Sequence, residues 1–181
     1  PDGFIHPAVR VLELGNEFNH AFKDKPRELR AAYAAVERAA QNLHRAFPQL
    51  AVATVNSDLG IIQKVHSDGR VEYHPDFRLK DIILNQLKSI DLYGLNIYRG
   101  TDMSKFFEEL TDLRQELADA GRLVKFYIAE MGVDAFDNTK YRVDETRHDD
   151  ANMAIVKQVR EFYGAHRDWF LGGLLMSFQD E

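Results

Sequence analysis

The chain has 181 residues, of which 45% are hydrophobic, a formal net charge of −6 and no cysteine. This length and apolar content are sufficient for one globular domain with a core. The acidic balance, without a dense run of Lys and Arg, argues against a nucleic-acid surface. No apolar run reaches the roughly 18 residues of a membrane span. The lack of cysteine excludes disulfides and thiolate metal sites, and the seven histidines form no ligand pair, so we expect no catalytic metal.

Short apolar runs alternate with amphipathic segments along the chain. Runs rich in branched residues predict strands over residues 9–14, 50–55, 91–98, 123–129 and 169–178. Apolar residues at helical spacing predict helices over residues 27–47, 79–90, 104–120 and 149–166. In the last helix, the side chains expected to face the core are Met153, Val156, Val159 and Tyr163. Within residues 60–76, the sequence Ser67-Asp68-Gly69 indicates the turn of a small hairpin.

The order of these elements predicts the fold class. Alternation of strand and helix through the whole chain is typical of an α/β fold with a parallel sheet and crossover helices, either doubly wound or a barrel. No glycine-rich phosphate loop follows any expected strand, so a nucleotide-binding fold has no support. Without repeats, low-complexity tracts or linkers, residues 1–181 are expected to form one domain.

Two glutamates lie at the ends of strand-like runs, Glu17 in the first run and Glu130 in the fourth. In parallel α/β folds, the active site forms at the carboxyl ends of the strands. Two carboxylates brought together there are the minimum equipment for acid/base and nucleophilic cleavage of a glycosidic bond. Further polar residues expected at the same ends are Asn16, Asn56, Asn96, Tyr98 and Gln179. This clustering predicts a site without reference to any family.

Four segments, in order along the chain, resemble strands of one enzyme group. The run from His6-Pro7-Ala8 to Gly15-Asn16-Glu17-Phe18-Asn19 resembles the acid/base strand of clan A glycoside hydrolases. It looks most like the catalytic (β/α)8 barrels of glycoside hydrolase family 2 and related β-glycosidases. Residues 91–100, 128–135 and 172–181 resemble the sixth strand, the nucleophile strand and the eighth strand of that group.

The resemblance implies that the chain is the C-terminal part of a (β/α)8 TIM barrel, comprising strands four to eight. The first three strands would precede Pro1, and the final helix would follow Glu181. A full barrel needs about 250 residues. We therefore expect residues 1–181 to be a partial glycosidase barrel, with unpaired edges on its first and last strands and no activity on its own.

The resemblance also implies a retaining hydrolase in which Glu17 is the general acid/base and Glu130 the nucleophile. Asn16 would bind the sugar 2-hydroxyl, and Tyr98 would direct its hydroxyl at Glu130. Phe178 stands where the family usually has an aromatic sugar platform, often Trp. The expected substrate-binding residues are Asn16, Asn96, Tyr98 and Phe178. The carboxyl groups of a retaining pair lie about 5–5.5 Å apart, and the Tyr98 hydroxyl should lie about 2.6–3.2 Å from Glu130.

Other interpretations stay open. A single strand-end glutamate is commonly an ion-pair partner, Asn16 and Asn96 are typical loop caps, and Tyr98 suits packing at a barrel rim. The same residues would serve a β-glucan transglycosylase, and a barrel that has lost turnover would be a carbohydrate-binding protein. The expected partner is an oligosaccharide or polysaccharide, with no cofactor, nucleic acid or membrane span. Only the substrate class favours a periplasmic or secreted location.

Overall fold

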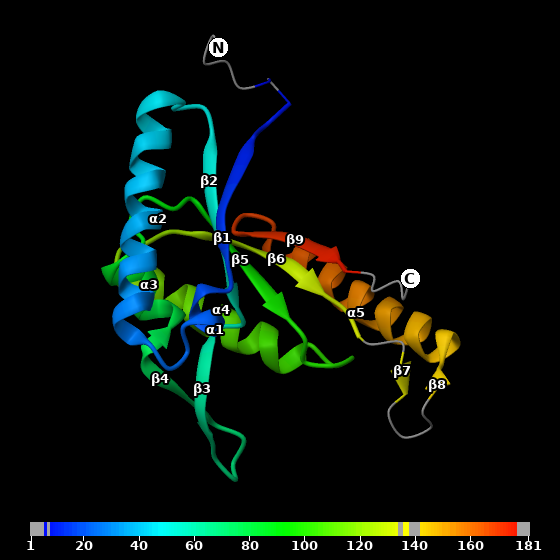
Figure 1. Cartoon of the computed structure of the whole chain (residues 1–181). Helices are drawn as coiled ribbons and strands as arrows, with labels where there is room; N and C mark the ends of the chain where they lie inside the picture. The colour runs from blue at the N-terminus through cyan, green and yellow to red at the C-terminus, as the bar shows by residue number, and fades with distance from the viewer. Residues whose placement is uncertain (1–5, 7, 134–135, 138–141, 177–181) are drawn as a thin grey trace. The chain divides into compact units, whose positions relative to one another are not determined.

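The five strands of the main sheet are separated by helices along the chain, as the sequence pattern predicts (Figure 1). The structure is a computed structural model that describes residues 6, 8–133, 136–137 and 142–176. The elements in chain order are β1 (Val11–Asn16), α1 (Phe18–Ala21), α2 (Pro26–Ala46), β2 (Ala51–Ser57), β3 (Gly60–Val65), β4 (Val71–Arg78), α3 (Leu79–Asn85), β5 (Leu92–Ile97), α4 (Ser104–Asp119), β6 (Lys125–Met131), β7 (Phe136–Asp137), β8 (Arg142–Val143), α5 (Glu145–His166) and β9 (Phe170–Leu175).

The main sheet has five strands in the order β1-β2-β5-β6-β9. β1 is parallel to β2, and β6 is parallel to β9, because a helix connects successive strands of the sheet. The fold is thus mixed α/β with a parallel sheet, as expected. The chain divides into two compact units, residues 1–94 and 95–181. No helix in the described ranges combines the length and the apolar character needed to cross a membrane.

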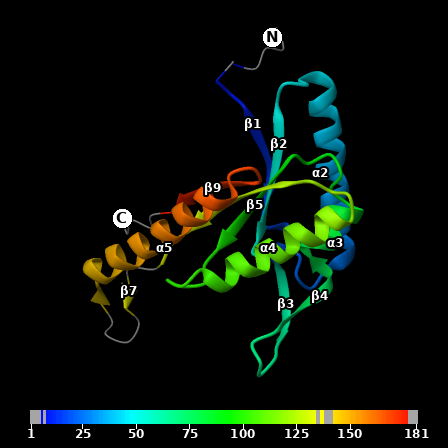
Figure 2. The same cartoon turned by 180° about the vertical axis from the view of Figure 1, so that it is seen from behind.

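In the first unit, helix α2 packs against β1 and β2, as both views show (Figures 1 and 2). Pro26 occupies the first position of α2, where its missing N–H costs nothing. The buried face of the helix carries Leu29, Tyr33, Val36 and Ala40. The antiparallel strands β3 and β4 follow β2 and form the hairpin expected around residues 67–69.

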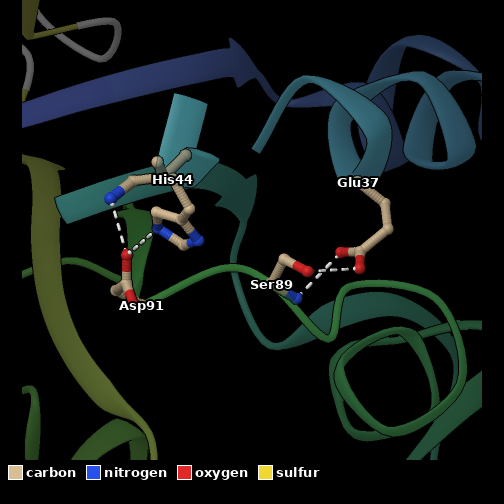
Figure 3. Close-up of polar contacts among 5 residues, drawn as sticks. Glu37, His44, Ser89 and Asp91 are labelled. Atoms are coloured by element: carbon tan, nitrogen blue, oxygen red, sulfur yellow. Dashed lines mark hydrogen bonds and ion pairs between the residues drawn. The ribbon is translucent and has the colours of Figure 1, made fainter. Parts of the chain in front are cut away.

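Helix α3 ends at Asn85, five residues before the end expected from the sequence. The N–H groups of Gln86 and Leu87 both bond the Ile82 carbonyl, which closes the helix. Beyond it, the N–H and hydroxyl of Ser89 donate to the Glu37 carboxylate at 2.9 and 2.7 Å (Figure 3). These tertiary bonds hold the residues after Asn85 in a non-helical conformation. The apolar residues there are spaced as in a helix because they are buried, not because they are helical.

A second polar contact in Figure 3 ties α2 to the segment before β5. The His44 imidazole lies 2.8 Å from a carboxylate oxygen of Asp91, and the same oxygen accepts the Val52 N–H at 2.8 Å. Val52 and Asp91 lie at the amino ends of β2 and β5. Because active sites of parallel α/β folds form at the carboxyl ends, contacts at the amino ends contribute to stability.

In the second unit, helix α5 lies beside β9 (Figures 1 and 2). It begins at Glu145, four residues earlier than expected, because the Asp144 side chain accepts the Arg147 N–H at 3.1 Å and caps the helix. The prediction that Met153 and Tyr163 face the core is wrong, since Met153 is 68% and Tyr163 41% exposed.

The true inward face of α5 is set by an aromatic cluster. Phe162 stacks on Phe107 of α4, with ring centroids 4.2 Å apart, and packs edge-on against Trp169 and Phe170. Aromatic rings bury more apolar surface than Met, so this cluster decides how the helix is rotated. Trp169 is buried in the core and directly precedes β9.

Candidate active site

Glu17 follows the last residue of β1 directly, rather than being that residue. Its N–H donates to the Val55 carbonyl at 3.0 Å and so extends the pairing with β2. Its carbonyl accepts the N–H groups of His20 and Ala21, each at 2.9 Å, and so begins α1. The backbone is left-handed at this point, with φ 51° and ψ 36°. The chain thus turns sharply from strand into helix at the candidate acid/base, whose side chain is half-buried.

A β-bulge directly precedes this turn. Glu13 pairs with Ala53 and Asn16 with Val55. Between these two pairs the chain advances three residues in β1 but only two in β2, so β1 contains one extra residue. Gly15 lies within the bulge at φ 79°, and a Cβ there would come within 2.2 Å of the Phe18 ring. Bulges change the direction of the residues that follow them and occur often beside active sites.

The structure places the polar residues near this turn in two different environments. Asn16 is exposed at the end of β1. Asn56 is buried, and its side-chain oxygen accepts the Tyr33 hydroxyl of α2 at 2.5 Å. Burial raises the pKa of Tyr33 above its usual value, so the phenol is a neutral donor. Asn56 therefore contributes to the contact of β2 with α2.

Asn19, two residues after Glu17, was not predicted as a site residue. Its side chain is fully buried. The amide donates to the Ser57 carbonyl at 2.7 Å and accepts the Ser57 N–H at 2.9 Å. The available signal was a polar residue two positions after Glu17, between the two aromatic residues Phe18 and Phe22.

Glu130 is the penultimate residue of β6 and lies at a second bulge. Ile128 pairs with Gly173 and Met131 with Leu175, so β6 has one extra residue between these pairs. A Cβ on Gly173 would lie 3.1 Å from the Ile128 side chain and 3.3 Å from the Met131 side chain. Both side chains therefore lie near Gly173, although Ile128 and Met131 are three positions apart in β6. Strict alternation would send them to opposite faces. The bulge therefore alters the direction of the intervening Glu130, which is half-buried.

Tyr98 lies one residue beyond β5, and its hydroxyl donates to a Glu130 carboxylate oxygen at 2.9 Å. This confirms the predicted hydrogen bond, in the predicted distance range. The Met176 sulfur lies 3.5 Å from the same hydroxyl. The Tyr98 hydroxyl therefore contacts Glu130 of β6 and Met176, which directly follows β9. Tyr98 is 47% exposed, so part of its side chain is accessible to solvent.

The loop after Tyr98 is held by polar contacts on both sides. Arg99 donates to Glu109 of α4 at 2.6 Å, and its guanidinium lies 5.5 Å from the Phe106 ring centroid. Gln158 of α5 accepts the Met103 N–H at 2.9 Å and donates to the Thr101 carbonyl at 2.7 Å. These contacts fix the path of the chain from β5 to α4 and thereby the position of Tyr98.

The remaining candidates have different outcomes. Asn96 lies in β5, one residue before its end, and is buried at 3% exposure. Phe178 and Gln179 lie outside the described residues. Among the described residues, no group of three or more His, Asp or Glu side chains is arranged to hold a metal ion.

Each unit therefore presents one glutamate at a bulged strand end. In the first unit, Asn16 and Glu17 are adjacent at the end of β1. In the second unit, the fold brings Tyr98 and Glu130 together from β5 and β6. A carboxylate that accepts a phenol hydroxyl in an accessible position can act chemically as a base or a nucleophile.

Comparisons with known proteins connect this arrangement to an enzyme fold. No family model and no curated protein match the chain. Among solved structures, a putative β-galactosidase from Bacteroides fragilis has a TM-score of 0.57 at 18% identity, over 95% of this chain and 22% of that chain. A β-glucosidase from Exiguobacterium marinum has a TM-score of 0.54 at 15% identity, over 90% and 54%.

An endo-1,4-β-D-mannanase from Thermotoga petrophila RKU-1 has a TM-score of 0.54 at 13% identity, over 92% of this chain and 44% of that chain. The chain thus spans about half or less of the length of these structures. At such identities the similarity concerns the fold alone. The chain has a glycosidase-like α/β fold.

Proposed function

We propose that this chain is a C-terminal part of the catalytic (β/α)8 barrel of a retaining glycoside hydrolase that cleaves a β-linked glycoside. The observation that carries the proposal is the hydrogen bond from Tyr98 to Glu130 at a bulged strand end. The glycosidase-like fold supports it, and the three solved structures described above are named as enzymes of β-linked glycosides. Membership of clan A, close to family 2, is part of the proposal.

In the first step of the proposed mechanism, a Glu130 oxygen attacks the anomeric carbon and forms an ester bond to the sugar. The bond from that carbon to the leaving oxygen breaks, and Glu17 gives its proton to that oxygen. In the second step, Glu17 takes a proton from water. The resulting hydroxide equivalent displaces Glu130, which leaves the sugar with its original configuration and both carboxyl groups in their starting states.

The other candidates assist these steps. Tyr98 holds one oxygen of Glu130 and leaves the other for the anomeric carbon. Asn16, next to the acid/base, binds the sugar 2-hydroxyl, a contact that strengthens in the transition state. Asn96 and Phe178 complete the substrate contacts. A retaining mechanism requires the two carboxyl groups to lie about 5–5.5 Å apart, which a crystal structure of the intact protein would measure directly.

The test is to trap the covalent intermediate. Fluorine at C2 disfavours the oxocarbenium-like transition states of both steps. In an aryl β-glycoside with a good leaving group, the first step should still proceed, so the glycosyl ester should form and then hydrolyse only slowly. Mass spectrometry of the digested protein should find one sugar on the peptide that contains Glu130. Glu130→Gln should remain unlabelled. A label elsewhere, or release of the aryl group without any labelled protein, contradicts the assignment.

The trap should be applied both to the 181-residue chain and to the intact polypeptide that carries it. We propose that residues 1–181 supply strands four to eight, and that the remaining strands complete the substrate pocket. Labelling should then occur in the intact polypeptide and be absent from the 181-residue chain. Equal labelling of both would show that these residues form a complete catalytic domain. Binding of oligosaccharide without turnover by either would support a carbohydrate-binding protein instead.

A further inference from the structure

The backbone at Glu17 adopts a conformation that it would not keep by itself. With φ 51° and ψ 36°, it lies in the left-handed region, which disfavours residues with a Cβ. Such conformations persist where the surrounding structure determines them, and they are concentrated at functional sites. The segments on both sides of Glu17 must therefore be held in place.

The upstream side is held by the sheet. The Glu17 N–H donates to the Val55 carbonyl at 3.0 Å and so anchors the residue to β2. The downstream side is α1, a helix of four residues. A single turn is far too short to be stable alone, because helix nucleation is unfavourable until several further bonds form. A tertiary contact must therefore fix α1.

Asn19 makes the polar part of that contact, beside the packing of the Phe18 ring against Tyr33. Its fully buried amide pairs with both main-chain groups of Ser57, donating to the carbonyl at 2.7 Å and accepting from the N–H at 2.9 Å. The side chain thus replaces the strand that would otherwise pair with the last residue of β2. Burying an amide is unfavourable unless its donor and acceptor are both satisfied, and here both are.

We propose that Asn19 is a positioning residue for the general acid/base. By tying α1 to Ser57, it holds Glu17 in the left-handed conformation and fixes the direction of its carboxyl group. The role in catalysis rests on the proposed function of Glu17, whereas the role in holding the backbone does not. The two parts are tested separately.

The backbone part is tested by NMR on the 181-residue chain and on Asn19→Ala. In the unaltered chain, the Cα and Cβ shifts and the HN–Hα coupling of Glu17 should report a positive φ. In Asn19→Ala they should move toward values for extended backbone, while those of β2 before Val55 stay unchanged. Should Asn19→Ala fail to fold, Asn19→Ser keeps at most one of the two bonds and should give an intermediate shift. A positive φ retained in both variants would overturn the proposal.

The catalytic part is tested in the intact polypeptide. Asn19→Ala should lower kcat/KM for an unactivated β-glycoside roughly 10- to 100-fold, the range expected for a misplaced catalytic group. For an activated aryl glycoside, which needs little protonation, the loss should be less than about threefold. Tyr93→Phe is the matched control, since it removes one buried hydrogen bond in the same unit, to the Leu87 carbonyl, between residues outside α1 and β2. It should leave the ratio of the two rates unchanged.

Equal losses on both substrates for Asn19→Ala would mean that Asn19 has only a structural role, and would overturn the catalytic part. If the unaltered polypeptide does not hydrolyse either glycoside, the proposed function fails. The NMR result then still decides whether Asn19 holds Glu17.

Discussion

The two candidate glutamates both lie at a β-bulge, Glu17 directly after one and Glu130 within one, and the contacts described at each involve different atoms. At the end of β6, the side chain of Glu130 is held, because a Glu130 oxygen accepts the Tyr98 hydroxyl at 2.9 Å. At the end of β1, the backbone of Glu17 is held, by the Val55 carbonyl before it and by α1 after it. Tyr98 in turn is fixed through the loop that Gln158 binds.

This difference corresponds to the two roles in the proposed mechanism. A nucleophile forms a bond to carbon, so one oxygen must stay in one position while the other reacts. An acid/base gives a proton to one oxygen and then takes one from water, so its carboxyl group must reach both from a fixed position. The hydrogen bond to the Glu130 carboxylate and the backbone bonds that fix where the Glu17 side chain begins both suit these requirements. Substitutions at each glutamate and its support test that correspondence.

The largest effect is expected at Glu130. Glu130→Gln keeps the shape of the side chain but removes the nucleophile, so turnover should fall roughly 10⁴-fold or more. The loss should be similar for activated and unactivated β-glycosides, since both need the covalent step. Steady-state kinetics of the intact polypeptide measure this. Glu108→Gln, on the exposed face of α4, is the control and should retain full activity. Substantial turnover by Glu130→Gln would remove Glu130 from the mechanism.

Glu17→Ala should separate substrates by their leaving groups. Loss of a general acid typically costs about 10²- to 10⁴-fold. We expect that loss for unactivated glycosides, whose leaving oxygen needs a proton. Activated aryl glycosides should lose much less in the first step, and the covalent intermediate should accumulate as a burst. A uniform loss across leaving groups, without a burst, would mean that Glu17 is not the acid/base.

The sequence predicted the coarse arrangement better than the two strand ends. Apolar periodicity located every strand of the main sheet within a few residues, because burial repeats with the period of the element. The order of motifs also led to the contact between Tyr98 and Glu130, which the structure confirms. What periodicity cannot show is an inserted residue. The bulges at Gly15 and near Glu130 change the direction of the neighbouring side chains but leave the strands as apolar as before. Neither bulge was therefore predicted.

Tertiary contacts caused the other differences. The end of α3 depends on Ser89 reaching Glu37 across the fold, and the rotation of α5 depends on Phe162 meeting Phe107. The two residues of each contact are far apart in the sequence, so the spacing of apolar residues within one helix cannot predict the contact. The left-handed backbone of Glu17 likewise depends on Asn19 and Ser57, which are 38 positions apart.

A smaller effect is expected from the support of Glu130. Tyr98→Phe keeps the ring but removes the hydroxyl that donates to the carboxylate. A hydrogen bond to a charged group is worth about 1.5–3 kcal/mol, so kcat should fall roughly 10- to 100-fold. KM should change little if the ring still packs against the ligand. Tyr163→Phe, on the exposed side of α5, is the control. Unchanged kcat in Tyr98→Phe would mean that the hydrogen bond seen here does not orient the nucleophile.

The smallest effect, and one on stability alone, is expected at Glu37, far from both glutamates along the chain. Its carboxylate accepts the N–H and hydroxyl of Ser89 in the contact shown in Figure 3. Burial raises the pKa of this carboxyl, but hydrogen bonds from Ser89, Gln41 and the Lys88 main chain outweigh burial and hold the pKa below its usual 4.5. Because this carboxyl group is partly exposed and Gln keeps one acceptor oxygen, Glu37→Gln should lower the free energy of unfolding by only about 0.5–1 kcal/mol at neutral pH, with kcat and KM unchanged.

The sign of the pH dependence follows from that lowered pKa. A carboxyl group with a lower pKa in the folded state stabilises the fold at pH values above its unfolded pKa, and this stabilisation is lost as the pH falls through the folded value. The difference in unfolding free energy between the unaltered chain and Glu37→Gln should therefore be largest above about pH 5 and shrink below about pH 4. Urea unfolding followed by circular dichroism at several pH values measures it, with Glu28→Gln on the exposed face of α2 as the control. A difference that grows toward acid pH would mean that Glu37 is bound to Ser89 in its protonated form.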